Sequence, residues 1–116
     1  MSCPLDYSLC NQTVTLYRLR GDALHRQVVE KAFYQWERRE HPEELGIRQD
    51  TVFTLILPGQ WELQPGDRVF SGIGPVISKN QWAGFIPACV EGLSQVQYVK
   101  KFSWQGAVCH TEAGRR

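Results

Sequence analysis

The chain has 116 residues, a hydrophobic content of 42% and a formal net charge of +1. This length suits one domain with a modest core, and the composition excludes a disordered chain. The near-neutral charge gives no indication of broad affinity for nucleic acid or anionic membranes. No apolar run reaches the length that spans a bilayer, and the first residues lack the pattern of a signal peptide, so we expect folding in a cytoplasm.

The first third of the chain predicts two strands joined by a turn. Residues 13–19, TVTLYRL, alternate in polarity and are rich in β-branched and aromatic types, which favours a strand. Residues 20–22, RGD, follow as a turn, because glycine and aspartate are common turn residues. Residues 25–37 contain VVEKAFYQW and are interpreted as a long strand or the arm of a bent hairpin. Residues 1–12 are expected to form an N-terminal arm.

A long charged segment follows at residues 37–50. One proline and one glycine within it favour a loop that projects from the sheet. Its interspersed opposite charges are typical of a solvated loop, and the alternative is a contact between subunits in which mixed charge fixes the register. The candidate intersubunit residues of this loop are Arg38, Arg39, Glu40, Glu43, Glu44 and Arg48.

The middle of the chain predicts shorter strands separated by glycine and proline. Residues 51–58, TVFTLILP, read as an apolar strand closed by proline. A connecting loop follows, in which Pro65 and Gly66 fit the two central positions of a type II turn. Residues 68–72 predict another strand, which residues 75–78 continue beyond a glycine bend.

The last third predicts one short irregular helix and a terminal hairpin. The helix is expected within residues 81–93, and residues 94–104 and 106–112 are expected to pair across a Gln105-Gly106 turn. Residues 113–116 are expected to fray. Together these elements predict a single domain of the all-β, mainly antiparallel class. We expect a small β-barrel or sandwich with long loops and one short helix.

The glycine-rich stretch LQPGDRVFSGIGP, residues 63–75, carries no phosphate-binding signature. No Lys-Ser or Lys-Thr pair follows Gly72 or Gly74, as a P-loop requires, and no third glycine completes a dinucleotide fingerprint. We therefore interpret Gly66 as part of a turn, and the other two glycines as a bend or bulge in a strand.

No other pattern predicts catalysis, a cofactor or a metal. His25, His41 and His110 lack the spacing of a zinc protease helix, and no serine sits in a G-x-S-x-G elbow. The spacing of the four cysteines matches no usual zinc motif, so we expect free cysteines, buried or idle. The sequence thus predicts a protein that is not an enzyme and has no cofactor.

Four tryptophans are many for so small a domain, and tryptophan is enriched at interface hot spots. Trp61, in a loop, is the first candidate for a contact between subunits, and the alternative is that it caps the end of the barrel. Trp82 and Phe85, in the predicted helical segment, are further candidates for such a contact.

The order of these motifs resembles that of the minor structural proteins of tailed phages and prophages of Gram-positive bacteria, encoded among head–tail connector genes. In those sequences a TVTLY-type strand leads to a strand ending near tryptophan. An apolar strand ending in proline, a GD-x-(V/I)-x-x-G turn and a terminal H-x-E-x-G follow. The matching residues here are Trp36, Pro58, Gly66, Asp67, Val69, Gly72, His110, Glu112 and Gly114.

The resemblance implies a head-completion or stopper protein that forms a homo-oligomeric ring in the virion, at the head–tail interface, after assembly in the bacterial host cytoplasm. Its partners would be copies of itself, the portal or adaptor, and tail-terminator or tail-tube proteins. Packaged double-stranded DNA would pass through the lumen without sequence-specific contact, and the charged loop of residues 37–50 would line this channel. No membrane would be involved. One alternative is a tail terminator or other tail-completion protein.

Two alternatives of other classes remain open. A small β-barrel could bind a peptide or single-stranded nucleic acid. Trp and Tyr side chains would then form a stacking platform, and Arg38 and Arg39 would contact the nucleic-acid backbone. A zinc-stabilised module using the four cysteines is the other.

Overall fold

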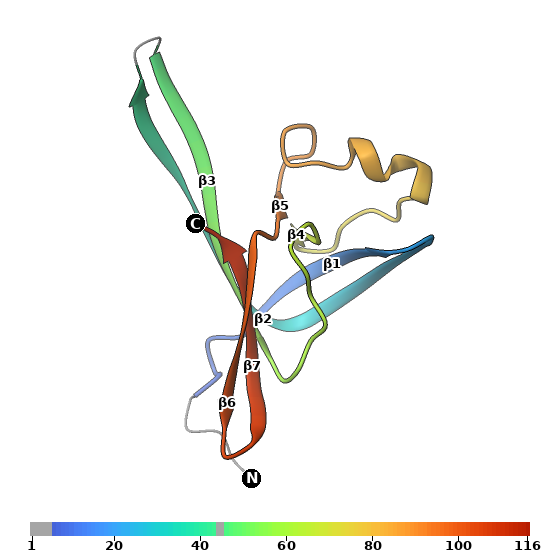
Figure 1. Cartoon of the computed structure of the whole chain (residues 1–116), viewed down its shortest axis with the longest axis vertical. Helices are drawn as coiled ribbons and strands as arrows, with labels where there is room; N and C mark the ends of the chain where they lie inside the picture. Colours follow the sequence, from blue (N-terminus) through green and yellow to red (C-terminus); the bar gives the residue numbers. More distant parts are fainter. Residues whose placement is uncertain (1–5, 44–45) are drawn as a thin grey trace.

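The computed structural model describes the backbone of residues 6–43 and 46–116 and the side chains of residues 6–37 and 52–116. The chain is mostly antiparallel β-structure, a seven-stranded sheet curled into a half-barrel (Figure 1). The strand order is β5-β4-β1-β2-β3-β7-β6. The elements are β1 Gln12–Arg20, β2 Ala23–Glu43, β3 Gly46–Pro58, β4 Arg68–Ser71, the 3-10 helix η1 Lys79–Gly84, β5 Leu93–Gln95, β6 Tyr98–Trp104 and β7 Ala107–Arg115. The predicted fold class is confirmed.

The predicted tight turns are also confirmed. The β1–β2 hairpin closes at Gly21, whose φ is 59°. The β6–β7 hairpin closes through Gln105 and Gly106, both with positive φ, as a type I′ turn requires. In the loop before β4, Gly66 has a φ of 98° and the Asp67 N–H donates to the Gln64 carbonyl, which fits the predicted type II turn.

The main core lies on one face of the curled sheet. Alternate residues of a strand point to the same face, and Phe53, Leu55 and Leu57 of β3 are all buried for this reason. The core consists of Val14, Leu16, Val29, Ala32, Tyr34, Phe53, Leu55, Leu57, Leu63, Val69, Val96 and Ala113. Trp61 and Val99 pack against its margin.

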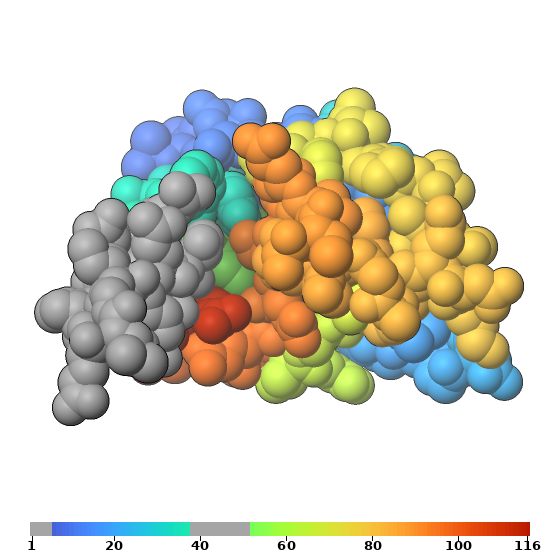
Figure 2. Space-filling model, turned by 90° about the horizontal axis from the view of Figure 1, so that it is seen from above, coloured from blue at the N-terminus to red at the C-terminus, as the bar shows by residue number. Residues whose placement is uncertain are grey.

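A second, smaller core lies under the segment between β4 and β5. Tyr17, Phe85 and Leu93 are buried there, with Phe70, Ile77, Trp82 and Val90 packed around them. Figure 2 shows this segment, in yellow and orange, as a continuous part of the surface on one side of the molecule. The predicted short helix within residues 81–93 is the 3-10 helix η1, which lies slightly earlier in the chain.

The expectation of a charged loop at residues 37–50 is wrong. β2 and β3 pair without a register shift from Phe33↔Ile56 to Glu43↔Gly46, so the backbone on both sides of residues 44–45 is a hairpin. Figure 1 shows this hairpin extending well beyond the rest of the sheet. A charged composition predicts exposure to solvent, but it does not prevent a cross-strand ladder when the register is already set by apolar neighbours.

The expectation of a frayed tail at residues 113–116 is also wrong. β7 runs to Arg115 and lies between β3 and β6, so both of its edges are paired. Ala113 is completely buried, and Gly114 faces Thr54 on β3 and Tyr98 on β6.

Two further expectations for the second half of the chain fail. Residues 75–78 do not continue β4 as a strand. The expected single strand over residues 94–104 divides into β5 and β6, because the backbone of Val96 turns to bond Gly66 and Asp67.

The expectation of free cysteines holds for Cys10 and Cys89. It is wrong for Cys109, which is disulfide-bonded.

Candidate functional site

The glycine-rich stretch is held against β1 by a buried polar side chain. The Thr15 hydroxyl donates to the Gly72 carbonyl and accepts from the Gly74 N–H, each at 2.8 Å. Gly72 has a φ of 92°, a conformation that favours glycine. A Cβ at Gly74 would lie 2.2 Å from the Tyr17 hydroxyl oxygen. The predicted glycine bend is confirmed, and its role is architectural.

Two longer side chains also hold this stretch. Together with Thr15 they form what is called the glycine clamp, in which Thr15, Tyr17 and Arg26 bind backbone groups of residues 72–75. The Tyr17 hydroxyl donates to the Pro75 carbonyl at 2.6 Å, and Arg26 donates to the Gly74 carbonyl. Burial raises the pKa of Tyr17, so its hydroxyl stays protonated and available as a donor. No group in this clamp is arranged as a nucleophile and base.

A charged pair ties the turn before β4 to the end of β1. The two terminal nitrogens of Arg20 donate to the two carboxylate oxygens of Asp67, at 2.7 and 2.8 Å. Asp67 is 3% exposed and also accepts from the Gln64 N–H at 2.8 Å. The hydrogen bond to Asp67 raises the pKa of Arg20. Because every partner belongs to the turn or the sheet, this pair stabilises structure.

Trp82 and Phe85, two of the candidate interface residues, contact other residues of the same chain. The Arg68 guanidinium lies 3.8 Å from the centre of the Trp82 ring and donates to the Phe85 carbonyl at 2.6 Å. Burial lowers the pKa of Arg68. The Phe85 ring is buried against Tyr17, with ring centres 4.6 Å apart, so it does not face outward.

Trp61, the third candidate, is half-buried against the main core. Its indole N–H donates to the Pro58 carbonyl at 2.9 Å, and its backbone N–H donates to the Thr111 hydroxyl. This location fits the alternative of a cap on the barrel, and a contact between subunits through Trp61 stays a prediction.

The candidate charged residues lie on the projecting hairpin. Arg38, Arg39, Glu40 and Glu43 belong to β2 and Arg48 to β3, while Glu44 lies outside the described residues. The backbone places Arg39 opposite Asp50 and Glu40 opposite Gln49. The side chains of residues 38–51 are outside the described part of the chain, so a role in a channel or contact stays a prediction.

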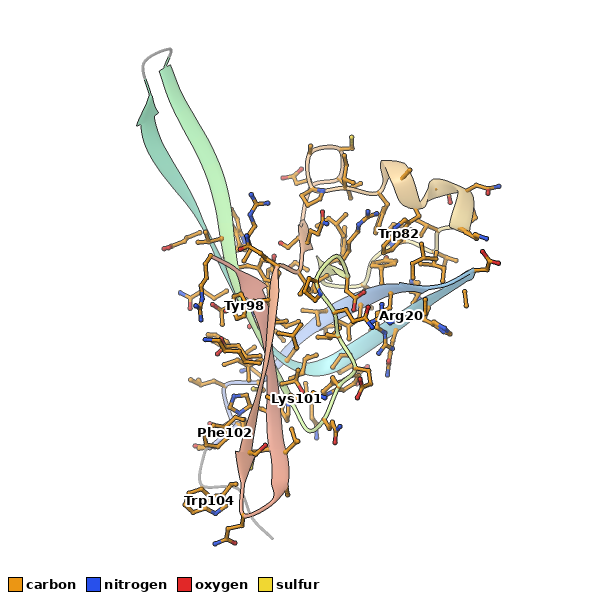
Figure 3. All side chains as sticks on the ribbon, in the orientation of Figure 1. Arg20, Trp82, Tyr98, Lys101, Phe102 and Trp104 are labelled. Atoms are coloured by element: carbon orange, nitrogen blue, oxygen red, sulfur yellow. The ribbon has the colours of Figure 1, made fainter. Side chains whose placement is uncertain are left out.

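Aromatic side chains, which were not singled out as site residues, follow one side of β6. Figure 3 shows Tyr98, Phe102 and Trp104 along this side, with Lys101 on the other. Phe102 is 36% exposed and Trp104 is 44% exposed. The alternation of the aromatic residues in the sequence could have indicated this face, but their exposure depends on β6 lying at the margin of the sheet.

The two ends of this aromatic face differ in how they are held. Tyr98 donates to Glu112 at 3.0 Å and lies under the Arg116 guanidinium, 4.6 Å from the ring centre. Phe102 stacks on His110 with ring centres 5.1 Å apart and an angle of 7° between planes.

His110 joins the β6–β7 hairpin to the segment before β1. Its Nδ1 shares a hydrogen bond of 2.7 Å with the Tyr7 hydroxyl. Burial lowers the pKa of His110, and the Glu112 carboxylate opposes this shift. The neutral imidazole is therefore favoured in the folded chain. Its contacts with Tyr7 and Phe102 indicate that His110 packs the hairpin against the segment before β1.

A surface hollow lies where β7 ends beside β3. This groove has a volume of about 470 Å³, and its lining includes Trp36, Glu37, Phe53, Tyr98, Arg115 and Arg116. It contains no paired nucleophile and base. Among the described residues, no three His, Cys, Asp or Glu side chains gather as metal ligands would, and no helix is long and apolar enough to cross a membrane.

Comparisons with known proteins give no relative: no family model, no curated protein and no solved structure matches the chain.

Proposed function

We propose that the chain is a non-enzymatic structural subunit that assembles with copies of itself. Its place would be the connector at the head–tail interface of a tailed phage or prophage-derived particle, as a head-completion or stopper ring. The observation that carries this proposal is the shape of the chain. The β2–β3 hairpin extends past the curled sheet, and the molecule measures 53 × 36 × 23 Å along its principal axes (Figure 1).

The projecting hairpin supports an assembly role because no described strand of the chain pairs with its outer edges. β1 pairs with β2 only as far as Ala32, and β7 pairs with β3 only as far as Phe53. Beyond these residues the two strands continue with no other described strand beside them. Two strands in water are marginally stable without a third strand or a packed face. A neighbouring subunit would supply this third strand or packed face.

The described polar clusters also fit a structural subunit. The glycine clamp and the Arg20–Asp67 pair each bind backbone groups of the chain and fix its loops in place. A ring needs two different complementary faces on each subunit, since head-to-tail contacts close into a cycle. Loops held at fixed positions provide such faces.

The partners in this proposal are copies of the chain, the portal or adaptor on one side, and tail-terminator or tail-tube proteins on the other. Packaged double-stranded DNA would pass through the lumen. The net charge of +1 suits such a passage, because dense positive charge would retain DNA through many phosphate contacts.

The experiment combines solution mass with particle composition. The purified chain is analysed by light scattering alone and with the portal complex, and purified particles from the source are analysed by mass spectrometry and electron microscopy. The proposal expects a ring at the head–tail interface. A chain that is absent from the particles and monomeric beside the portal would overturn it, whereas density at the head-proximal end of the tail tube, below the connector, would favour a tail-terminator role.

A second candidate function, the binding of single-stranded nucleic acid, is favoured by the face of β6. Phe102 and Trp104 are exposed on the same strand as Lys100, and aromatic rings beside cations can stack bases and contact phosphates. Fluorescence anisotropy with a labelled oligothymidine would test it. Binding that weakens steeply with salt and is lost in Trp104→Ala supports this function, and no binding at low salt overturns it.

A further inference from the structure

The part of the β2–β3 hairpin that lies beyond the sheet is called the arm, residues 33–43 of β2 and 46–52 of β3. Each of its strands has one edge paired with the other strand and one outer edge. Among the described residues, no strand pairs with either outer edge of the arm. Exposed edges present rows of N–H and C=O groups that can pair with another chain.

The outer edge of β2 is blunted. The Tyr34 N–H points to this edge, where it donates to the Gln12 side-chain carbonyl at 2.8 Å. Alternate residues of a strand direct their N–H groups to the same side, so Pro42 falls on this edge too. Proline has no N–H, and proteins place it on edges where strand addition is avoided.

The outer edge of β3 has no such protection. The Gly59 N–H, just after β3, donates to the Cys109 carbonyl on the β7 side at 2.8 Å. Since the β2–β3 and β3–β7 registers are uninterrupted, the same alternation directs the N–H groups of Ile47, Gln49 and Thr51 to this side. Residues 46–52, GIRQDTV, contain no proline.

Beside this edge, no described strand follows β7. β7 stops with Arg115 opposite Phe53, and the groove of about 470 Å³ lies at that point. An added strand along residues 46–52 would continue the sheet where β7 leaves it, without displacing a described strand.

We propose that the outer edge of β3 pairs antiparallel with the same edge of a second copy of this chain. Such an edge is self-complementary in its hydrogen bonds, because a two-fold axis exchanges its donors and acceptors. Residues 46–52 carry one arginine and one aspartate, so their net charge is zero. Pairing centred on Gln49 sets position 48 of one copy opposite position 50 of the other, an arginine opposite an aspartate, which favours this register.

The pair forms a four-stranded ribbon in the order β2-β3-β3-β2. This supplies the third strand that each arm lacks. The inference goes beyond the proposed ring, because an isologous pair closes at two copies. It holds or fails whether or not the chain is a connector subunit.

The first test measures the mass of the purified chain by sedimentation velocity over a range of concentrations. The wild-type chain is expected to dimerise. Thr51→Pro removes an N–H that points to the outer edge of β3, so no hydrogen bond to β2 is lost. Dimerisation is expected to weaken about tenfold or more. The matched control Glu40→Pro removes an outward N–H from the blunted edge of β2, and it should leave dimerisation unchanged.

The second test does not depend on the proline variants folding. In a Cys89→Ser background, which removes an exposed thiol, Gln49→Cys should form an intermolecular disulfide under mild oxidation, since position 49 lies opposite itself across the axis. Glu40→Cys, one strand further from the axis, should not.

Three results would overturn the pairing. A chain that is monomeric at every concentration excludes it, and so does a dimer that Thr51→Pro leaves intact with no cross-link at position 49. Oligomers larger than two that survive Thr51→Pro and show no cross-link at position 49 would support the ring and contradict this pairing, so the two proposals can fail separately.

Discussion

The two halves of the β2–β3 hairpin share one uninterrupted register but differ in what surrounds them. In the inner half, Ala32, Leu55 and Leu57 are buried, where β1 pairs with β2 and β7 pairs with β3. Trp36, two positions beyond Tyr34 and on the same face, is 54% exposed because the neighbouring strands have ended. Backbone pairing is therefore continuous along the hairpin, while the hydrophobic contribution to its stability is confined to the inner half.

The largest expected effect is in the inner half. Leu55→Ala removes a completely buried side chain from the main core, so we expect the free energy of unfolding to fall by about 2–5 kcal/mol. Urea unfolding followed by circular dichroism measures this change. Leu55→Met, which nearly conserves volume, should cost less than about 1.5 kcal/mol. Equal losses for the two variants would contradict a packing origin.

The glycine clamp should show a smaller but clear effect. In Gly74→Ala the new methyl group would meet the Tyr17 hydroxyl and the Phe70 side chain, and such overpacking costs about 1–3 kcal/mol. Gly84→Ala is the control, because nothing lies within 4 Å of the added group. Thermal unfolding of both variants compares them, and a stable Gly74→Ala chain would show that the clamp can relax.

A moderate effect on stability is expected when the pH is lowered. Burial lowers the pKa of His110 in the folded chain, so the unfolded chain binds the proton more readily. Stability should therefore be unaffected by this residue well above pH ~6.5 and decrease as the pH falls below that value. Urea midpoints between pH 8 and 5 measure the slope. His110→Gln should flatten it.

The smallest effect on stability is expected in the arm. Trp36→Ala removes a side chain that is more than half exposed, and the free energy of unfolding should change by at most about 0.5 kcal/mol. Urea unfolding at low protein concentration is the measurement. A loss comparable with that of Leu55→Ala would mean that the arm is covered in solution, which would remove the contrast between the two halves.

The elements predicted correctly are those whose signals are local. TVTLYRL and TVFTLILP carry strand-forming side chains in alternating or continuous apolar patterns, and they lie within β1 and β3. Gly66, Gln105 and Gly106 adopt the positive φ values that their turns require. The short helix was expected with less accuracy, since η1 has no buried residue to reveal it.

The expectations that failed concern elements whose neighbours are distant in sequence. Residues 113–116 are held because β3 and β6 pair with β7 on both sides, which no pattern in AGRR indicates. The site residues show the same limit. The composition of the segment containing Trp82 and Phe85 favoured an exposed contact, yet Phe85 is buried against Tyr17, far away in the chain.

The sequence by itself determined the antiparallel class and the turns, because alternation and φ preferences act over a few positions. Tertiary structure alone decided which of the described strands become edges, and that a charged segment is a paired arm. These features depend on contacts between residues far apart in the chain, and a local pattern of polarity is the same whether or not a third strand lies beside it.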